Sequence, residues 1–474
     1  MPTTKIVATL GPSSRSLDIV RQLIRAGVDV FRINASHAGK DDIGALVQTV
    51  RSAADELHAN IGVLLDLQGP KIRLGTFENG GCVLETGARF TITTEQLVGN
   101  CQRAATTYPE FAKDVRADDR ILLADGSVEL KALHSDGVAV ECEVISGGPI
   151  GDRKGINLPG VQVSTPSLTK KDMADLRAGL EAGVDFVALS FVRRREDVLR
   201  LRHFLEENDS TIPIVSKIEK PEGWQNFDAI LEESDGVMVA RGDLGVELAL
   251  EKVPAIQKAM ILRARIKGKF VITATQMLES MIQNQFPTRA EVSDVANAIY
   301  DGTDAIMLSA ETGAGKYPVE AATMMARIAK ESDETIKREG FHGAPDPGES
   351  PTHPQIMAHV AFEAAQMVNA AAIVVFSVSG SSGRLVASYR PPVPVYVFTH
   401  SQEVARQLSI VYGVRPLVVP LAESTDGMLQ QMDRMLSERR SLKPKDCVVF
   451  VAGQPIGRKG TTNLIKLHRV GELR

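Results

Sequence analysis

The sequence predicts an α/β protein built on a closed (β/α)8 barrel, or TIM barrel, with an inserted all-β lid domain and a C-terminal α/β domain with an open sheet. Short apolar segments followed by helical patterns recur eight times between residues 5 and 308. A β-rich stretch over residues 70–165 interrupts this series once, and a Gly- and Pro-rich stretch ends it. These three observations define the predicted fold class.

The composition limits the class of protein. The chain has 474 residues, 43% hydrophobic and 24% charged, so it can bury the cores of two or three domains. Its net charge of −5 is spread without a basic block, which argues against nucleic acid or a membrane surface as a partner. Neither a secretory signal nor a membrane-spanning segment is evident, and the 4 cysteines form no C-x-x-C pair. We therefore expect a soluble cytoplasmic protein with reduced thiols.

Each predicted barrel strand is a short apolar run. The runs lie at residues 5–10, 28–33, 61–66, 186–191, 214–218, 236–240, 270–273 and 305–308. Two helix starts between them are clearest, because Thr169 precedes Asp172 and Thr288 precedes Glu291 at the spacing of a capping box. Apolar residues then recur every three or four positions, and Gly302 marks the end of the second helix. Parallel strands joined by helices in this way close into a barrel.

Two further domains are predicted. Residues 70–165 hold β-branched runs at 90–94, 121–123 and 138–144, separated by Asp-Gly turns, and show no long helical pattern. We expect them to form a lid over the barrel mouth, so that the barrel comprises residues 1–69 and 166–340. A linker at 341–352 leads to a C-terminal domain at 353–474, with strands at 372–377, 393–398, 414–420, 447–451 and 464–470.

Charged and hydroxyl side chains stand at the C-terminal ends of the predicted barrel strands. The clearest unit is the strand, helix, strand stretch at 214–247, whose first strand ends in Lys217 and Glu219. An isolated Lys-x-Glu pair is often only a solvated pair at a sheet edge. Barrel closure, however, would gather several such strand ends into one ring. The members of that ring are Arg32, Asp66, Lys217, Glu219, Asp243 and Thr275.

The composition of this ring suits phosphoryl chemistry with a divalent metal. Mg²⁺ commonly takes one or two carboxylates plus substrate oxygens, so Glu219 and Asp243 are sufficient protein ligands. Arg32 and Lys217 can neutralise a phosphoryl group in transfer. Residues 241–245, Arg-Gly-Asp-Leu-Gly, predict a turn whose N–H groups can approach an anion. A magnesium-dependent barrel lyase that handles a pyruvate enolate is a second candidate, and a non-catalytic sugar-phosphate sensor is a third.

Several long motifs resemble those of the pyruvate kinase family, over essentially the whole chain. They are TKIVATLGPSS at the start, FRINASH at 31–37, SKIEKPEG at 216–223, VARGDLGVE at 239–247, ATQMLESM at 274–281 and PTRAEVSDVANAIYDGTDAIMLSAET at 287–312. The resemblance implies the barrel, lid and C-terminal domain described above. It also implies a phosphotransferase of glycolysis that transfers the phosphoryl group of phosphoenolpyruvate to ADP, giving pyruvate and ATP.

The resemblance also implies roles for the residues that match these motifs. Lys217 and Arg32 would stabilise the phosphoryl group in transfer, and Thr275 would help to position the water that protonates the enolate. Glu219 and Asp243 would hold Mg²⁺ or Mn²⁺. The implied substrate-binding positions are Arg32, Lys217, Gly242, Asp243 and Thr275, and the implied nucleotide-binding positions are Arg73, Lys154, His37 and Asn157.

One departure concerns the potassium ion that many family members need. The matching cation positions are Asn34, Ser36, Asp66 and the residue after it. This sequence has Lys71 in the following D-L-Q-G-P-K motif, which resembles the branch of the family that works without potassium. We expect that K⁺ is not required, because the fixed ammonium of Lys71 can supply the charge of the absent cation. Alternatively, Lys71 points to solvent.

The C-terminal domain contains a Ser- and Gly-rich loop that follows a predicted strand and opens a helix. Its N–H groups, hydroxyls and guanidinium could cradle the phosphate of an allosteric effector, at a position that matches a sugar-phosphate or nucleotide site in the family. It could also be an ordinary turn. The family resemblance further implies a homotetramer. The loop residues in question are Ser377, Ser379, Gly380, Ser381, Ser382 and Arg384.

Overall fold

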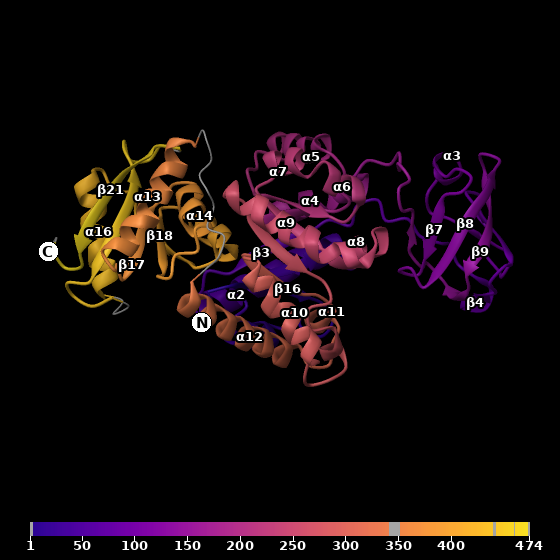
Figure 1. The fold of residues 1–474 in the computed structure, drawn as a ribbon, viewed down its shortest axis with the longest axis horizontal. Helices are drawn as coiled ribbons and strands as arrows, with labels where there is room; N and C mark the ends of the chain where they lie inside the picture. Colours follow the sequence, from indigo (N-terminus) through magenta and orange to yellow (C-terminus); the bar gives the residue numbers. More distant parts are fainter. Residues whose placement is uncertain (1–2, 341–350, 439–441, 459, 473–474) are drawn as a thin grey trace.

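The computed structural model describes residues 3–340, 351–438, 442–458 and 460–472 (Figure 1). A closed barrel lies between two smaller units, with the lid on one side and the C-terminal domain on the other (Figure 1). The predicted fold class is confirmed. The domain boundaries given above stay predictions, and residues 341–350 of the predicted linker lie outside the described residues.

Eight parallel strands form the barrel, and each is hydrogen-bonded to two neighbours so that the sheet closes. Around the barrel they are β1 (Lys5–Leu10), β2 (Val30–Asn34), β3 (Gly62–Asp66), β12 (Phe186–Leu189), β13 (Ile214–Ile218), β14 (Gly236–Ala240), β15 (Phe270–Ala274) and β16 (Ala305–Leu308). The strand predicted at 186–191 ends earlier, because Phe191 turns the chain with a positive φ of 56°. The strand predicted at 28–33 begins two residues later, after the left-handed Gly27 that caps the preceding helix.

The helices of the barrel unit follow its strands. They are α1 (Leu17–Ala26), α2 (Lys40–Glu56), α4 (Lys170–Ala182), α5 (Arg195–Glu207), α6 (Pro221–Gln225), α7 (Phe227–Glu233), α8 (Arg241–Glu247), α9 (Val253–Ile266), α10 (Arg289–Tyr300), α11 (Ala310–Gly313) and α12 (Pro318–Glu339), with 3-10 turns at η2 (Leu250–Lys252) and η3 (Glu279–Ile282). Both predicted capping boxes form, at Thr169 before α4 and at Thr288 before α10. Their N-terminal N–H groups are thereby satisfied locally.

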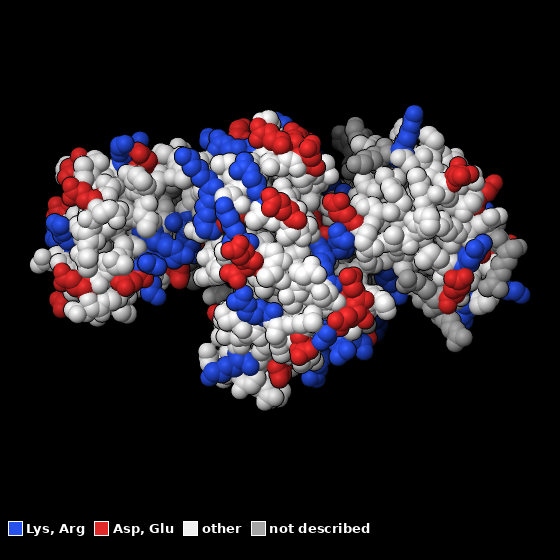
Figure 2. Space-filling view, turned by 180° about the vertical axis from the view of Figure 1, so that it is seen from behind, with Lys and Arg blue, Asp and Glu red and all other residues white. Residues whose placement is uncertain are grey.

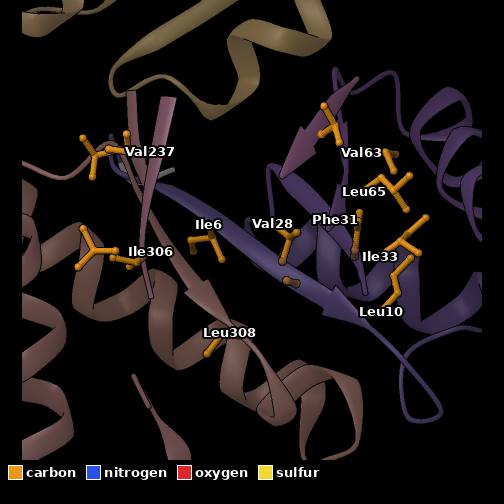
Figure 3. Close-up of a cluster of buried hydrophobic side chains, with 14 of the residues drawn as sticks. Ile6, Leu10, Val28, Phe31, Ile33, Val63, Leu65, Val237, Ile306 and Leu308 are labelled. Carbon is orange, nitrogen blue, oxygen red and sulfur yellow. The ribbon is translucent and has the colours of Figure 1, made fainter. Parts of the chain in front are cut away.

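Two apolar layers hold the barrel together. Ile6, Phe31 and Val63 belong to the layer between the strands and their surrounding helices (Figure 3). Their sequence neighbours Val7 and Leu64 belong to a second cluster, which continues into the core of the C-terminal domain. Successive strand residues point to opposite faces, and burial on both faces explains why these strands are apolar throughout.

The lid is a β domain inserted between β3 and β12. Its six-stranded sheet has the order β11-β7-β8-β9-β5-β6, and β4 and β10 form a separate pair. The elements are η1 (Glu78–Gly80), β4 (Gly81–Leu84), β5 (Arg89–Thr93), β6 (Arg103–Ala105), α3 (Phe111–Asp114), β7 (Arg120–Leu123), β8 (Val128–Ser135), β9 (Ala139–Ser146), β10 (Gly148–Gly151) and β11 (Ile156–Asn157). The only α-helix among them has four residues, as the sequence predicts.

The C-terminal domain is an open five-stranded sheet in the order β19-β18-β17-β20-β21. Only the β20–β21 pair is antiparallel. Its elements are α13 (His353–Met367), β17 (Ala372–Phe376), α14 (Ser381–Ser388), β18 (Val395–Thr399), α15 (Gln402–Gln407), η4 (Leu408–Ile410), β19 (Val414–Val418), α16 (Thr425–Glu438), β20 (Cys447–Gly453) and β21 (Thr462–Arg469).

Aspartates mark the N-terminal end of the barrel and anchor the C-terminal domain there. Asp29, Asp185, Asp235 and Asp304 each precede an alternate strand and accept a hydrogen bond from the backbone N–H of a neighbouring strand, at 2.8–2.9 Å. Arg406 of the C-terminal domain binds Asp185 at 2.7 Å, and Arg390 binds Asp304 at 3.0 Å. The C-terminal domain therefore occupies the end of the barrel opposite to the predicted site.

Two further expectations concern membranes and thiols. Within the described residues, no helix has the length and apolar character needed to cross a bilayer. Cys82, Cys101, Cys142 and Cys447 are all free thiols.

Candidate active site

The predicted ring forms at the C-terminal ends of the barrel strands. Arg32 in β2 makes a two-point contact with Asp66 at the end of β3, with Nε and Nη2 2.7 and 2.6 Å from Oδ2. The ammonium of Lys217 in β13 lies 3.2 Å from Asp66 Oδ1 and 2.9 Å from Glu219 Oε1. Two cations and two carboxylates thus form one buried network, although they come from three strands and their connections.

Electrostatics keep most of this network charged. Burial alone would raise the pKa of Asp66, but Lys217 and Arg32 outweigh it and lower that pKa. Burial would lower the pKa of Lys217, yet Asp66 and Glu219 raise it, so this ammonium stays protonated. The pKa of Glu219 is raised, chiefly by burial and further by the charge of Asp243, although Lys217 opposes the shift. Glu219 and Asp243 are therefore close enough to repel each other.

The segment that carries Asp243 differs from its prediction. Residues 241–245 were expected to form a turn, but they lie in helix α8, which begins directly after β14. The Gly242 N–H donates to Thr275 Oγ1 at 2.7 Å, and that hydroxyl donates to the Ala274 carbonyl at 2.6 Å. Thr275 holds a positive φ of 69°, a costly conformation for a β-branched residue. The structure thus joins Gly242 and Thr275 directly, at the start of the helix that contains Asp243.

Of three further residues that shape this site, sequence reasoning missed Ser190 and Thr9, and it named Arg241 only as part of the predicted turn. Ser190, just after β12, accepts from Lys217 Nζ at 2.8 Å and donates to the Leu67 carbonyl at 2.7 Å. Thr9 accepts from Arg32 Nη1 at 3.1 Å. Arg241 donates to the Thr275 carbonyl at 2.8 Å and pairs with a carboxylate of α10 at 2.7 Å. Each lies at or next to the end of a barrel strand, which is the one signal that could have drawn attention to them.

The acidic groups at the site fit a magnesium ion that shares its coordination with a substrate. Glu219 Oε2 accepts a hydrogen bond from the Phe191 N–H, and its Oε1 pairs with the ammonium of Lys217. Repulsion from Asp243 contributes to its raised pKa, and a divalent cation between the two would relieve that repulsion. In the described part of the chain, no three His, Cys, Asp or Glu side chains group closely enough to hold a metal alone. Two carboxylates plus substrate oxygens are the arrangement that Mg²⁺ commonly uses.

A large cavity opens beside the ring and is lined by one of the predicted nucleotide contacts, His37. It has a volume of about 670 Å³ and is lined by Arg32, Asn34, His37 and Thr275, together with residues of the β1–α1 connection. His37 is thus placed next to the predicted phosphoryl-binding residues. A cavity of this size can accept a nucleotide.

The other predicted nucleotide residues lie at the hinges of the lid. Arg73 faces Gly155 across an antiparallel bridge, and its Nη1 donates to the Arg153 carbonyl at 3.1 Å. The carbonyl of Lys154 accepts from a neighbouring backbone N–H, and its side chain is exposed. Figure 2 shows Lys and Arg side chains gathered where the lid meets the barrel. These hinge cations do not line the large cavity described above.

The predicted replacement for potassium lies in a second cleft. Lys71 is half-buried and lines a small cleft at the hinge, together with Asn157, Lys220 and Asp243. The matching cation positions are engaged within the protein. Asp66 binds Arg32 and Lys217, and Asn34 Oδ1 accepts from the Ser36 N–H at 3.0 Å.

The predicted effector loop lines a separate, smaller pocket in the C-terminal domain. Ser377, Ser379, Ser381 and Ser382 line it, and Gly380 caps helix α14 with a φ of 76°. Arg384 is not among its lining residues. Its guanidinium Nη1 donates to the Ser379 carbonyl of the loop at 3.4 Å. Burial lowers the pKa of Arg384, opposed by the charge of Asp235. Arg458, from the β20–β21 connection, adds a cation to the lining of this cavity.

Comparisons with known proteins agree with this architecture. A family model described as pyruvate kinase, barrel domain, matches residues 1–322, and one described as pyruvate kinase, alpha/beta domain, matches residues 355–468. A pyruvate kinase of Mycobacterium tuberculosis is 46% identical over 469 residues, which cover 99% of this chain and 98% of that protein. One of Corynebacterium efficiens is 43% identical over 472 residues, with the same coverage of both chains.

A solved structure shows the same likeness in three dimensions. The crystal structure of a pyruvate kinase from Cryptosporidium parvum superposes with a TM-score of 0.91 at 36% sequence identity, covering 99% of this chain and 96% of that one. Sequence and structure agree over both the barrel and the C-terminal domain, so the chain belongs to the pyruvate kinase family of phosphotransferases.

Proposed function

We propose that this protein transfers the phosphoryl group of phosphoenolpyruvate to ADP, giving pyruvate and ATP, the last step of glycolysis. The observation that carries the proposal is the buried network of Arg32, Asp66, Lys217 and Glu219 beside Thr275 and α8. It places fixed positive charge where a phosphoryl group would pass, next to carboxylates that can share a metal.

The cations act on the moving phosphoryl group. An oxygen of the ADP β-phosphate attacks the phosphorus, and the bond to the enolate oxygen of phosphoenolpyruvate breaks. Lys217 is protonated and only 12% exposed, so its charge is poorly screened and stabilises the negative charge of the phosphoryl oxygens. Arg32 approaches from β2, oriented by its two bonds to Asp66. Both groups are held before substrate binds, which limits reorganisation during transfer.

We assign the binding and protonation of the other product to residues at the start of α8 and directly after β15. The Gly242 N–H and the Thr275 hydroxyl already share a hydrogen bond, and we assign them, with the backbone of Asp243, to the substrate carboxylate. The enolate left after transfer needs one proton at carbon. We assign to Thr275 the positioning of the water that delivers it.

Glu219 and Asp243 are the proposed ligands of Mg²⁺ or Mn²⁺. When bound, the metal would neutralise phosphate and enolate oxygens. The His37 side of the large cavity is the proposed place of the nucleotide, and Arg73 and Lys154 at the hinges of the lid are its further proposed contacts. A lyase would not need Lys217 or the lid. A non-catalytic sensor would not need the full set of catalytic residues in the ring.

Potassium independence is a separate part of the proposal. Lys71 lines the hinge cleft rather than standing free in solvent, and Asp66 is engaged by two protein cations. We expect the steady-state rate to be unchanged when K⁺ is replaced by a large organic cation, and the Lys71→Met variant to become stimulated by K⁺. An absolute potassium requirement in the unmodified protein would refute this assignment.

The C-terminal cavity is proposed to bind a phosphorylated effector. Four serine residues and the backbone at the start of α14 surround it, and Arg458 offers a cation. Isothermal titration with a sugar phosphate or nucleotide, in the presence of saturating phosphoenolpyruvate, tests the site. A heat of binding that is measured for the unsubstituted protein and absent in a Ser382→Ala variant supports the site. The absence of any binding outside the active site contradicts it.

We further propose that the protein is a cytoplasmic homotetramer. Both the barrel and the C-terminal domain carry exposed large apolar side chains, which contacts between identical copies could cover. On the barrel they include Leu250, Leu262, Ile266, Phe286, Val292 and Tyr300, and on the C-terminal domain they include Ile356, Val360, Met367 and Leu467. Light scattering on the purified protein gives the mass directly.

A further inference from the structure

A buried carboxylate on α8 joins the lid to the barrel away from the reacting groups. Glu247 ends this helix, four residues after Asp243, and its side chain is fully buried. One oxygen, Oε1, accepts from Lys220 Nζ at 2.6 Å and from the amide Nδ2 of Asn157 at 3.0 Å. Lys220 directly follows the proposed metal ligand Glu219, and Asn157 belongs to the lid.

Asn157 lies where the lid chain returns to the barrel. It is the last residue of β11, which pairs with β7 through the Asn157–Leu122 register. Two residues earlier, Gly155 faces Arg73 across the bridge that links the two hinge segments. A bond from Asn157 to the barrel therefore restrains the hinge itself rather than the outer part of the lid.

A second lid segment approaches the same helix. A Cβ placed on Gly126, in the turn between β7 and β8, would lie 3.7 Å from Val246 Cγ1. Two lid segments thus lie close to α8 at neighbouring residues, Val246 and Glu247. At Glu247 the lid makes a polar, directional bond to the helix.

The charge of Glu247 is balanced across a single short contact. Lys220 is 12% exposed and Glu247 is 0% exposed in their side chains, so the pair is poorly solvated. Glu247 Oε2 is buried and has no hydrogen-bond partner among the described residues. Charge and orientation of this carboxylate therefore depend on Oε1, which is the atom shared with the lid. A charge-assisted bond of this kind is stronger than one between neutral groups.

We propose that Glu247 is a positioning residue that fixes the hinge of the lid to the helix carrying Asp243, with Lys220 holding its charge in place. This inference rests on the proposed function, because it assigns the lid to nucleotide binding. In this state the Asn157 amide is occupied by Glu247, so we assign Asn157 to the hinge contact instead of the nucleotide contact implied by the family resemblance. Lid position and the orientation of α8 become coupled through one carboxylate.

The test uses Asn157→Ala and Glu247→Gln in the full-length protein, with Glu251→Gln as the matched control. Glu251 is exposed in the following 3-10 turn and offers the same chemical change without the hinge contact. Hydrogen exchange, followed by mass spectrometry without substrates, reports the hinge independently of activity. We expect amides of β11 and α8 to exchange about tenfold faster in Asn157→Ala, the size expected for loss of one charge-assisted bond, and the control to be unchanged.

Kinetics provide the second readout. Because ADP would span the lid and the barrel, we expect its KM to rise about fivefold to tenfold in Asn157→Ala, while kcat and the KM for phosphoenolpyruvate stay within about twofold. Should Glu247→Gln fold poorly because Lys220 is left unpaired, Lys220→Met/Glu247→Gln removes both charges and keeps the comparison intact.

Unchanged exchange in β11 and α8 of both variants would overturn the proposal, as would equal rises in KM for both substrates. If the variants exchange faster but the unsubstituted protein forms no pyruvate, the hinge contact is supported and the proposed function is rejected. The two failures are therefore distinguishable.

Discussion

Replacing Lys217 by Met separates the catalytic cation from the structural role of the same network. The side chain keeps its length but loses the ammonium that touches Asp66, Glu219 and Ser190 at 3.2, 2.9 and 2.8 Å. Removing one preorganised charge from a buried site costs a rate factor of about 10²–10³. We expect kcat to fall by at least that factor, with a smaller change in the KM for ADP.

The same substitution also lowers the stability of the fold, so the loss of activity must be separated from the loss of folding free energy. Removing one partner of a buried ion pair destabilises a protein by about 3–5 kcal/mol when the other charge is left uncompensated. Here Arg32 still holds Asp66 with two bonds, and the Phe191 N–H still binds Glu219. Glu219 can also take up a proton, since its pKa is already raised. The loss should therefore lie at the lower end, about 3 kcal/mol, and leave a folded protein.

Lys5 offers a matched control at the other end of the barrel. Its side chain is 11% exposed and lies 3.6 Å from Asp29, and its ammonium donates to the Val414 carbonyl at 3.0 Å. Lys5→Met should therefore lower the free energy of unfolding in urea but keep the rate of pyruvate formation. The reasoning is wrong if folded Lys217→Met retains more than about a tenth of the rate, or if Lys5→Met loses as much activity.

Three other predictions follow from the same structure. Arg390→Met should lower the free energy of unfolding by about 3–5 kcal/mol, because it leaves the buried charge of Asp304 without its ion-pair partner between the barrel and the C-terminal domain. An unchanged midpoint of unfolding in urea would contradict this. Burial raises the pKa of Cys142 to about 12, so its thiol should react slowly with an aromatic disulfide at pH 8 and faster as the pH rises. The exposed Cys101 should react at once. Rapid labelling of Cys142 together with Cys101 at pH 8 would contradict this prediction. Met367→Asp should halve the mass seen by light scattering, and an intact tetramer would exclude that face as an interface.

The barrel could be predicted because its signals are local. Each strand is apolar on both faces, and the capping boxes at Thr169 and Thr288 are formed by residues three positions apart. The lid followed from the interruption of that pattern and from its Asp-Gly turns. The ring of site residues followed from one rule, that barrel closure brings strand ends together, and the structure places Arg32, Asp66 and Lys217 in direct contact.

The remaining details depend on contacts between residues far apart in the sequence. Ser190 touches Lys217 only because β12 and β13 are neighbours, and an isolated serine carries no signal of that. Arg384 follows the effector loop in sequence and donates to its Ser379 carbonyl, but it does not line the cavity, whereas Arg458 lines it from a connection 74 positions later. The sequence at 241–245 predicts a turn because its glycines disfavour a helix. In the structure this segment is helical, and the helix packs against β15 and α9.

The most direct test of the account is the formation of pyruvate from phosphoenolpyruvate and ADP with Mg²⁺, measured with and without K⁺. The account predicts pyruvate and ATP in equal amounts, at the same rate under both conditions, and none when Mg²⁺ is removed by a chelator. Absence of pyruvate under both conditions, from a protein shown to be folded, would contradict the proposed function.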